Sequence, residues 1–83
     1  MDLGLKDKVA AITGGSVGIG LAVAQGLAAE GAHLALCARG AERLEQIAAD
    51  LRRTFGVRVL AVPADVSRAE DCQNFAAAVS AEF

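Results

Sequence analysis

The sequence has few aromatic residues and no block of like charge. Its 83 residues include neither tryptophan nor tyrosine, aromatic residues make up 4% of it, and the formal net charge is −2. This charge balance gives no electrostatic support for a nucleic acid or a membrane surface as a partner. The longest apolar runs are only as long as a β-strand, so none of them is expected to cross a bilayer.

Cysteine is also scarce, and a signal peptide is not evident. The two cysteines, Cys37 and Cys72, do not have metal-ligand spacing, so no metal site is predicted. We interpret them as reduced, buried thiols. Residues 1–6 lack the charged start and long apolar core of a signal peptide, and we therefore expect a cytoplasmic protein.

What the sequence does contain is a regular alternation of apolar runs and helical patterns. The chain is 54% hydrophobic, and the patterns predict strands at residues 8–13, 33–38 and 57–62 and helices at residues 18–30 and 41–55. Gly31 and Gly56 are placed to end the two helices. Ser67 and Glu70 have the spacing of a capping box, which predicts a third helix after residue 67.

This order of elements predicts an α/β fold with a doubly wound parallel sheet. The expected strands are apolar without alternation, as is typical of strands covered on both faces. Right-handed crossovers place the first two helices on one face, give the strand order 3-2-1, and send the third helix to the opposite face. Because the first strand would then be an unpaired edge and residues 81–83 fall within a helical pattern, we expect the front third of a larger protein.

Three glycines, Gly14, Gly18 and Gly20, lie between the first strand and the first helix in the spacing Gly-x-x-x-Gly-x-Gly. Backbone N–H groups at a helix N-terminus are unpaired and carry partial positive charge, and glycines let an anion approach them closely. The turn therefore predicts a phosphate cradle, although such turns can also be simple tight connections. Thr13 is expected to brace the turn, and Ser16 is placed to reach the ribose or its 2′-phosphate.

Arg39 stands at the end of the second strand, where a mononucleotide-binding unit faces the adenosine ribose. A carboxylate there would bond the ribose hydroxyls of NAD, whereas an arginine pairs with a 2′-phosphate, so the sequence favours NADP(H). A solvated arginine is the alternative. For Arg43, pairing with Glu42 and Glu45 is the simpler interpretation. A site for FAD or S-adenosylmethionine is a further alternative. Such sites favour an acid at this position, so Arg39 counts against them.

Asp65 and Val66 follow the third strand, at the same edge of the sheet. The carboxylate is placed to accept from the amino group of adenine, and the valine to pack on the ring. The alternative is an ordinary loop aspartate ahead of the Ser67 helix cap.

Together these motifs resemble the N-terminal part of a short-chain dehydrogenase/reductase of the subgroup usually called classical. The resemblance implies that residues 1–83 are the N-terminal half of a dinucleotide-binding Rossmann domain. It also implies oxidoreduction between a carbonyl and an alcohol, usually by a homotetramer or homodimer. By this resemblance the cofactor-binding residues are Gly14, Ser16, Gly18, Ile19, Gly20, Arg39, Asp65 and Val66.

The catalytic groups of that family are not found among these residues. Its members use a tyrosine and a lysine four residues later, together with a serine, but this chain has no tyrosine and its two lysines precede the first strand. Some NADP-using members carry a basic residue where this chain has Val17, so the NADP preference depends on Arg39. The substrate is not identified by these residues. A non-catalytic NADP-binding module of the same fold is the alternative function.

Overall fold

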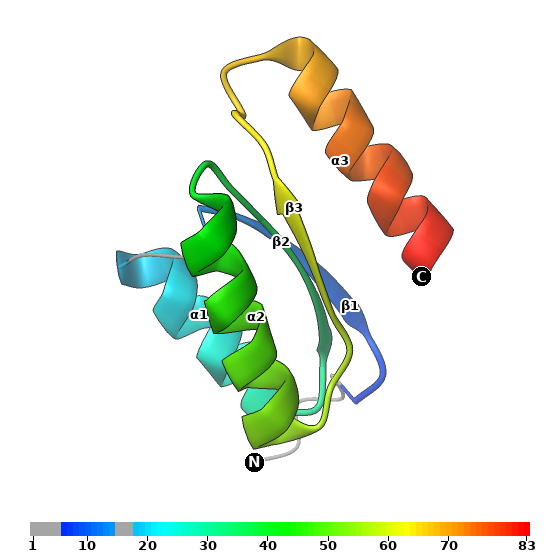
Figure 1. Ribbon diagram of the computed structural model, residues 1–83. Coiled ribbons are helices and arrows are strands. Elements are labelled where there is room, and N and C mark those ends of the chain that lie inside the picture. The colour runs from blue at the N-terminus through cyan, green and yellow to red at the C-terminus, as the bar shows by residue number, and fades with distance from the viewer. Residues whose placement is uncertain (1–5, 15–17) are drawn as a thin grey trace.

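The computed structural model describes residues 6–14 and 18–83 as three parallel strands and three helices (Figure 1). The six elements alternate along the chain as β1 (Val9–Thr13), α1 (Gly18–Ala29), β2 (His33–Ala38), α2 (Ala41–Phe55), β3 (Val59–Pro63) and α3 (Ala69–Glu82). The predicted order of strands and helices is therefore confirmed. The bounds of β2 and α2 agree with the prediction, and β3 begins two residues later than residue 57.

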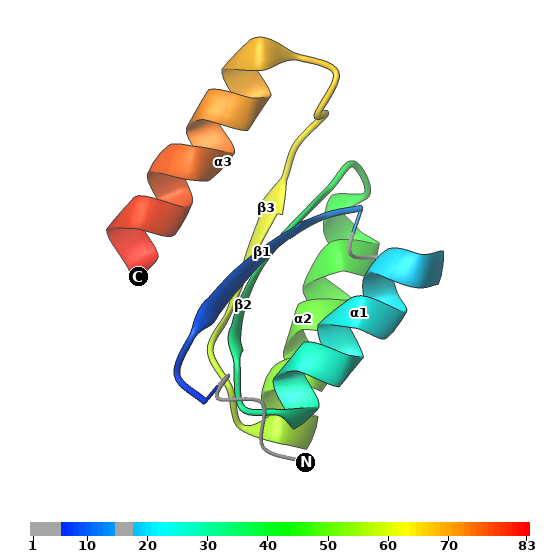
Figure 2. The ribbon, with the colours of Figure 1, turned by 180° about the vertical axis from the view of Figure 1, so that it is seen from behind.

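The three strands form one parallel sheet in the order β1-β2-β3, which is the predicted order 3-2-1 read from the other edge. Ala11 is level with Ala35 across β1 and β2, and Leu36 is level with Ala61 across β2 and β3. Seen from either side, α1 and α2 lie together on one face and α3 lies alone on the other (Figures 1 and 2). This arrangement confirms the doubly wound α/β fold.

The central strand β2 supplies the core on both faces of the sheet because its successive side chains point in opposite directions. Leu34 and Leu36 are fully buried in the larger cluster, which lies against α1 and α2 and includes Leu44. Cys37 is fully buried in the smaller cluster, which lies under α3 beside Phe75. A strand buried on both faces needs no polar alternation, which explains the unbroken apolar run.

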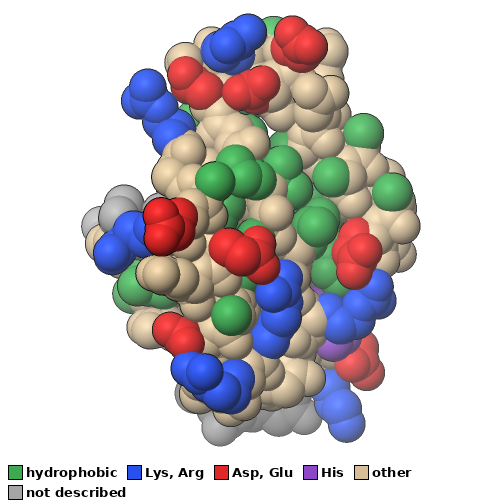
Figure 3. Space-filling view, in the orientation of Figure 1, with side chains coloured by type: hydrophobic (Ala, Val, Ile, Leu, Met, Phe, Trp, Pro, Cys, Tyr) green, Lys and Arg blue, Asp and Glu red, His purple; other side chains and the backbone are tan. Residues whose placement is uncertain are grey.

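The edge strand β1 is covered on one face only. Ala10 and Ile12 pack against the larger cluster, whereas Val9 and Ala11 on the other face are exposed. Within residues 6–14 and 18–83, β1 pairs with β2 and with no other strand. On the face shown in Figure 3, hydrophobic side chains gather over β3, between α2 and α3.

Both predicted glycine helix ends are confirmed. Gly31 has φ +86° and Gly56 has φ +68°, which is the left-handed region that glycine enters without a Cβ penalty. The Gly56 N–H donates to the carbonyl of Arg52 and so pairs one of the last helical acceptors of α2. Each glycine turns the chain directly from a helix into the next strand.

Two other predictions were wrong. The residue that precedes α3 as its N-cap is Arg68, and the Ser67 hydroxyl donates to the Oδ1 atom of Asp65 at 2.7 Å, so there is no capping box. In a capping box the hydroxyl oxygen would accept from a helix N–H, whereas here the hydroxyl donates to a carboxylate two residues away in the same loop. Cys72 is exposed, so only Cys37 is a buried thiol.

None of the helices in the described part of the chain has the length and apolar character needed to span a membrane.

Candidate functional site

The functional residues predicted from sequence meet at the edge of the sheet where its strands end. Because parallel strands end on the same side, the turn after β1, Arg39 after β2 and Asp65 after β3 are brought together there. This edge lies at the top of the view in Figure 1, where α2 and α3 begin. Residues separated by more than fifty positions in sequence therefore form one site.

Gly14 and Gly18 have the backbone conformation that makes the turn after β1 possible. Their φ angles are +69° and +52°, and a Cβ added at either position would meet no atom within 4 Å. The glycines are therefore required by the left-handed backbone and not by close packing. The Gly14 N–H also donates to the carbonyl of Cys37 at 2.7 Å, which ties the turn to β2.

The first turn of α1 is formed by Gly18, Ile19 and Gly20, and it contains no acidic side chain. The N–H groups of a first helical turn lack partners within the helix and favour an anion. Ser16 and the side chain of Ile19 lie outside the described residues. The described residues on either side of residues 15–17, Gly14 and the first turn of α1, lie at the edge of the sheet where the phosphate cradle is predicted.

A hollow of about 380 Å³ opens beside this turn. Its floor is largely apolar, two arginines stand at its rim, and its lining residues are Gly14, Cys37, Ala38, Arg39, Gly40, Arg43, Ala64 and Val66. The Val66 side chain is 52% exposed although it is apolar. An apolar floor with a few polar groups is typical of a small-molecule site.

Arg39 extends from this edge with little contact to the protein. Its side chain is 81% exposed, and its Nη2 atom lies 3.9 Å from the Oδ2 atom of Asp65. An exposed pair at this distance contributes little to stability. The guanidinium therefore keeps most of its hydrogen-bonding capacity, which a bidentate contact to a phosphate would use.

Asp65 is held with one carboxylate oxygen occupied and the other turned toward Arg39. Its Oδ1 atom accepts from the Ser67 hydroxyl at 2.7 Å and from the Ser67 N–H at 3.0 Å. These hydrogen bonds, with the positive charge of Arg39, lower the pKa of the Asp65 carboxyl, and partial desolvation only partly opposes them. The group is therefore ionised at neutral pH and able to accept a hydrogen bond through Oδ2.

The sequence interpretation missed Asp71 at this site. Its Oδ2 atom accepts from the Asp65 N–H at 2.8 Å, and it lines a second hollow of about 310 Å³ together with Arg39 and Asp65. The only sequence signal was an acid in the first turn of α3, a position where acids are common in helices generally. No group of three histidine, cysteine, aspartate or glutamate side chains within the described ranges is placed to hold a metal ion.

The chain belongs to the short chain dehydrogenase family, whose sequence pattern matches residues 8–83. Among similar sequences, an 11-beta-hydroxysteroid dehydrogenase-like protein of Arabidopsis thaliana is 48% identical over 68 residues, which are 82% of this chain and 22% of that protein.

Two solved structures are similar over nearly the whole chain. The L-sorbose reductase of Gluconobacter frateurii, in complex with NADPH and L-sorbose, has a TM-score of 0.98 and 49% identity, over 100% of this chain and 32% of that one. An alcohol dehydrogenase of the archaeon Thermococcus sibiricus, in complex with 5-hydroxy-NADP, has a TM-score of 0.91 and 47% identity, over 94% of this chain and 33% of that one. The chain therefore spans between a fifth and a third of the length of these relatives.

Proposed function

We propose that the protein is an NADP(H)-dependent oxidoreductase that interconverts a carbonyl and an alcohol, and that these residues bind the adenosine-phosphate part of the cofactor. The observation that carries this proposal is Arg39, an exposed guanidinium at the end of β2 on the rim of the hollow. A carboxylate at this place would accept from the ribose hydroxyls of NAD and repel a 2′-phosphate. An arginine attracts that phosphate.

The remaining residues of the edge fit the other parts of the same ligand. The turn with Gly14, Gly18 and Gly20 presents backbone N–H groups to the pyrophosphate, and the positive end of α1 stabilises its charge. Ser16 and Ile19 complete this turn in the proposal. The apolar floor of the hollow is suited to the adenine ring, with Val66 packing on the ring and Asp65 accepting from its amino group.

When bound, the cofactor would donate a hydride to a substrate carbonyl carbon or accept one from an alcohol carbon. These residues position one end of the cofactor, and none of them is proposed as a catalytic group. The tyrosine, lysine and serine that the family resemblance implies would lie in other parts of the protein. Reductases and dehydrogenases solved with NADPH or an NADP derivative support an enzyme over a non-catalytic binding module.

We also propose a cytoplasmic protein that assembles as a homodimer or a homotetramer and acts on a small carbonyl or alcohol substrate. The support for these features is the family resemblance. Sedimentation of the full-length protein would measure its assembly.

The experiment that tests the function is a turnover assay on the full-length protein. Oxidation of NADPH and of NADH is followed against a panel of ketones, aldehydes and sugars. We expect carbonyl-dependent oxidation of NADPH with a kcat/KM at least about tenfold above that with NADH, because an additional charge-assisted contact changes affinity by that order. Tight binding of NADPH without turnover on any carbonyl would favour the non-catalytic module, and equal use of the two cofactors would contradict the assignment of Arg39.

A further inference from the structure

The loop that joins β3 to α3 carries both proposed adenine contacts, and it is held from two sides. On the side of β2, the Ala64 N–H donates to the carbonyl of Ala38 at 2.9 Å. This bond continues the parallel ladder one step beyond β3. It fixes where the loop begins but leaves the conformation of Asp65 and Val66 to other contacts.

Those other contacts come from the first turn of α3. The Asp71 Oδ2 atom accepts from the Asp65 N–H at 2.8 Å, and the contact is partly buried. The next residue, Cys72, places its thiol 3.3 Å from the carbonyl oxygen of Val66. Two successive side chains of the helix therefore bond the backbone of the two residues proposed to face adenine.

The Asp71 bond is the stronger of the two because its acceptor is charged. A carboxylate that accepts a backbone N–H makes a short, charge-assisted hydrogen bond, whereas a thiol is a weak donor. Asp71 is also the third residue of α3, so its charge interacts favourably with the positive end of the helix. The helix, Asp71 and the Asp65 backbone thus form one continuous support.

The Asp65 side chain is fixed separately by Ser67. The hydroxyl and the N–H of Ser67 both bond Oδ1, which sets the orientation of the carboxylate. With its backbone held by Asp71 and its side chain held by Ser67, Asp65 directs Oδ2 toward the rim where Arg39 stands. A loop residue with both restraints is pre-organised, so binding costs less conformational entropy.

We infer that Asp71 is a positioning residue of the adenine subsite: its carboxylate holds the Asp65 backbone so that the Asp65 side chain accepts from the amino group of adenine. This inference rests on the proposed function. Asp71 does not contact the cofactor in this account and acts only through Asp65. It determines how well the site distinguishes a purine that carries an exocyclic amino group from one that does not.

The test compares two cofactors in the full-length protein. In nicotinamide hypoxanthine dinucleotide phosphate, in its reduced form, a carbonyl replaces the adenine amino group and N1 of the ring carries a hydrogen, while the rest of the molecule is the same as NADPH. We expect the wild-type protein to bind NADPH about tenfold more tightly than this analogue, because the amino group of NADPH donates one hydrogen bond to a charged acceptor and the analogue lacks that group. We expect Asp71→Ala to reduce that ratio to about twofold or less.

Three matched variants separate positioning from loss of charge or of folding. Asp71→Asn keeps an oxygen acceptor and should retain most of the ratio, and Glu70→Ala removes the same charge from the neighbouring exposed position and should leave the ratio unchanged. Asp71→Glu keeps the charge but moves the acceptor by one methylene, and it should lose the ratio as Asp71→Ala does. Asp71→Glu therefore tests the positioning role if Asp71→Ala does not fold.

The possible results are distinct. An unchanged ratio in Asp71→Ala or Asp71→Glu would overturn the inference, and so would an equal loss in Glu70→Ala. If the wild-type protein binds NADPH well but does not distinguish the analogue, the adenine contact and the role of Asp71 are wrong while NADP(H) binding stands. If the wild-type protein binds neither cofactor, the proposed function fails, and Asp71 has no such role.

Discussion

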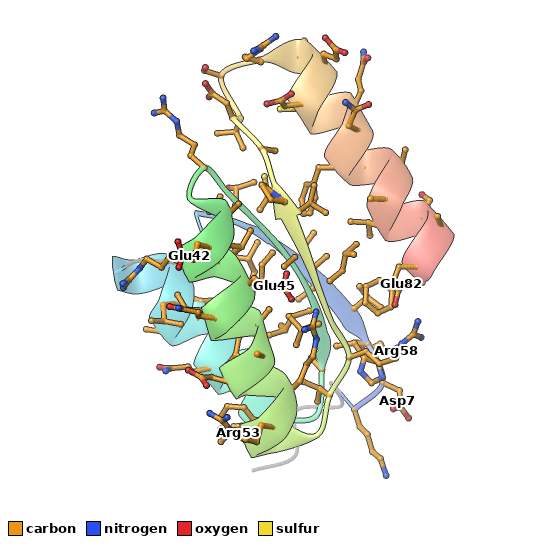
Figure 4. All side chains as sticks on the ribbon, in the orientation of Figure 1. Asp7, Glu42, Glu45, Arg53, Arg58 and Glu82 are labelled. Atoms are coloured by element: carbon orange, nitrogen blue, oxygen red, sulfur yellow. The ribbon has the colours of Figure 1, made fainter. Side chains whose placement is uncertain are left out.

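The two edges of the sheet are both rich in charged side chains, but those side chains are used differently. At the edge where the strands begin, Arg58, His33, Asp7, Glu82 and Phe83 form a connected group, which we call the amino-edge cluster. At the edge where the strands end, and among the residues that the structure describes, Arg39 faces the Asp65 carboxylate at 3.9 Å. Figure 4 shows Asp7, Arg58 and Glu82 side by side, well away from the opposite edge.

Within the amino-edge cluster, each polar contact joins different elements of the fold. Arg58 donates to the Glu82 carbonyl at 2.7 Å and to its carboxylate at 3.1 Å, and its guanidinium lies 4.8 Å from the centre of the Phe83 ring. The Arg58 N–H donates to Nδ1 of His33 at 3.0 Å, and Nε2 of His33 lies 3.4 Å from the Asp7 carboxylate. These contacts link the segments that precede β1 and β3 to the start of β2 and the end of α3.

The two arginines differ in what they contact: Arg58 bonds other parts of the fold, and Arg39 remains accessible to a ligand. The Arg58 side chain is 55% exposed, and the orientation of its guanidinium is fixed by bonds from Nη2 to a carbonyl and a carboxylate and by the Phe83 ring. The Arg39 side chain is 81% exposed, and its described ion pair with Asp65 is 3.9 Å long, so it is held less firmly and is more accessible to a ligand. The N-terminus of α1, which favours an anion, lies at the edge of Arg39.

The largest expected effect is at the ligand edge. Arg39→Asp in the full-length protein removes the proposed 2′-phosphate contact and adds repulsion, so we expect the affinity for NADPH to fall about 100-fold. The affinity for NADH should stay within a few-fold of its wild-type value or rise. Fluorescence titration with each cofactor measures both.

The matched control for this change is Arg58→Asp, which makes the same change of charge at the opposite edge. Its ratio of NADPH to NADH affinity should equal that of the wild-type protein. A similar loss of preference in both variants would show that net charge, and not the position of Arg39, determines the choice of cofactor.

The next effect is on stability and belongs to the amino-edge cluster. Arg58→Ala removes a partly exposed ion pair and a cation–π contact, so we expect the free energy of unfolding to fall by about 1 kcal/mol. Urea denaturation of the full-length protein measures it. Arg53→Ala removes the exposed pair with Asp50 within α2 and should cost less than about 0.5 kcal/mol. Equal losses would mean that the cluster adds nothing beyond an ordinary surface pair.

The smallest effect concerns the titration of Asp65. The hydrogen bonds from Ser67 are the main cause of its lowered pKa, so Ser67→Ala should raise that pKa toward the ordinary aspartate value. Because the folded-state pKa is lowered, ionised Asp65 stabilises the fold above the unfolded-state pKa, and this contribution is lost as the pH falls through the folded-state pKa. In Ser67→Ala this contribution should be smaller, and its loss should be complete at a higher pH than in the wild-type protein.

Carboxyl-carbon NMR of Asp65 measures this titration directly. Ser80→Ala, on the exposed surface of α3, is the control and should leave the pKa of Asp65 unchanged. An unchanged pKa in Ser67→Ala would show that the hydrogen bond from the Ser67 hydroxyl does not govern the ionisation of Asp65, because alanine keeps the backbone N–H.

Much of the fold could be predicted from the sequence because the signals were local. The strand bounds of β2 followed from an apolar run, and the two helix ends followed from Gly31 and Gly56, whose φ angles only glycine adopts readily. The strand order followed from the handedness of crossovers, which depends on the twist of the chain and not on particular side chains.

What could not be predicted was which of several polar side chains would bond in the loop after β3. Ser67, Asp65 and Asp71 lie within seven residues, and each is able to cap a helix or bond a loop N–H. The outcome depends on the path of the loop, whose starting point is fixed by the bond of Ala64 to β2, a contact distant in sequence. The exposure of Cys72 was missed for a related reason, because a helical stripe does not show how far the partner sheet extends.

The central claim is that this edge of the sheet recognises an adenosine that carries a 2′-phosphate. The most direct measurement uses ligands that reach only this edge: titration of the full-length protein with adenosine 2′,5′-bisphosphate and with adenosine 5′-monophosphate, each competing with bound NADPH. The account predicts that the bisphosphate binds at least about tenfold more tightly and that Arg39→Ala removes most of this difference. Equal affinities in the wild-type protein, or a difference that survives Arg39→Ala, would contradict it.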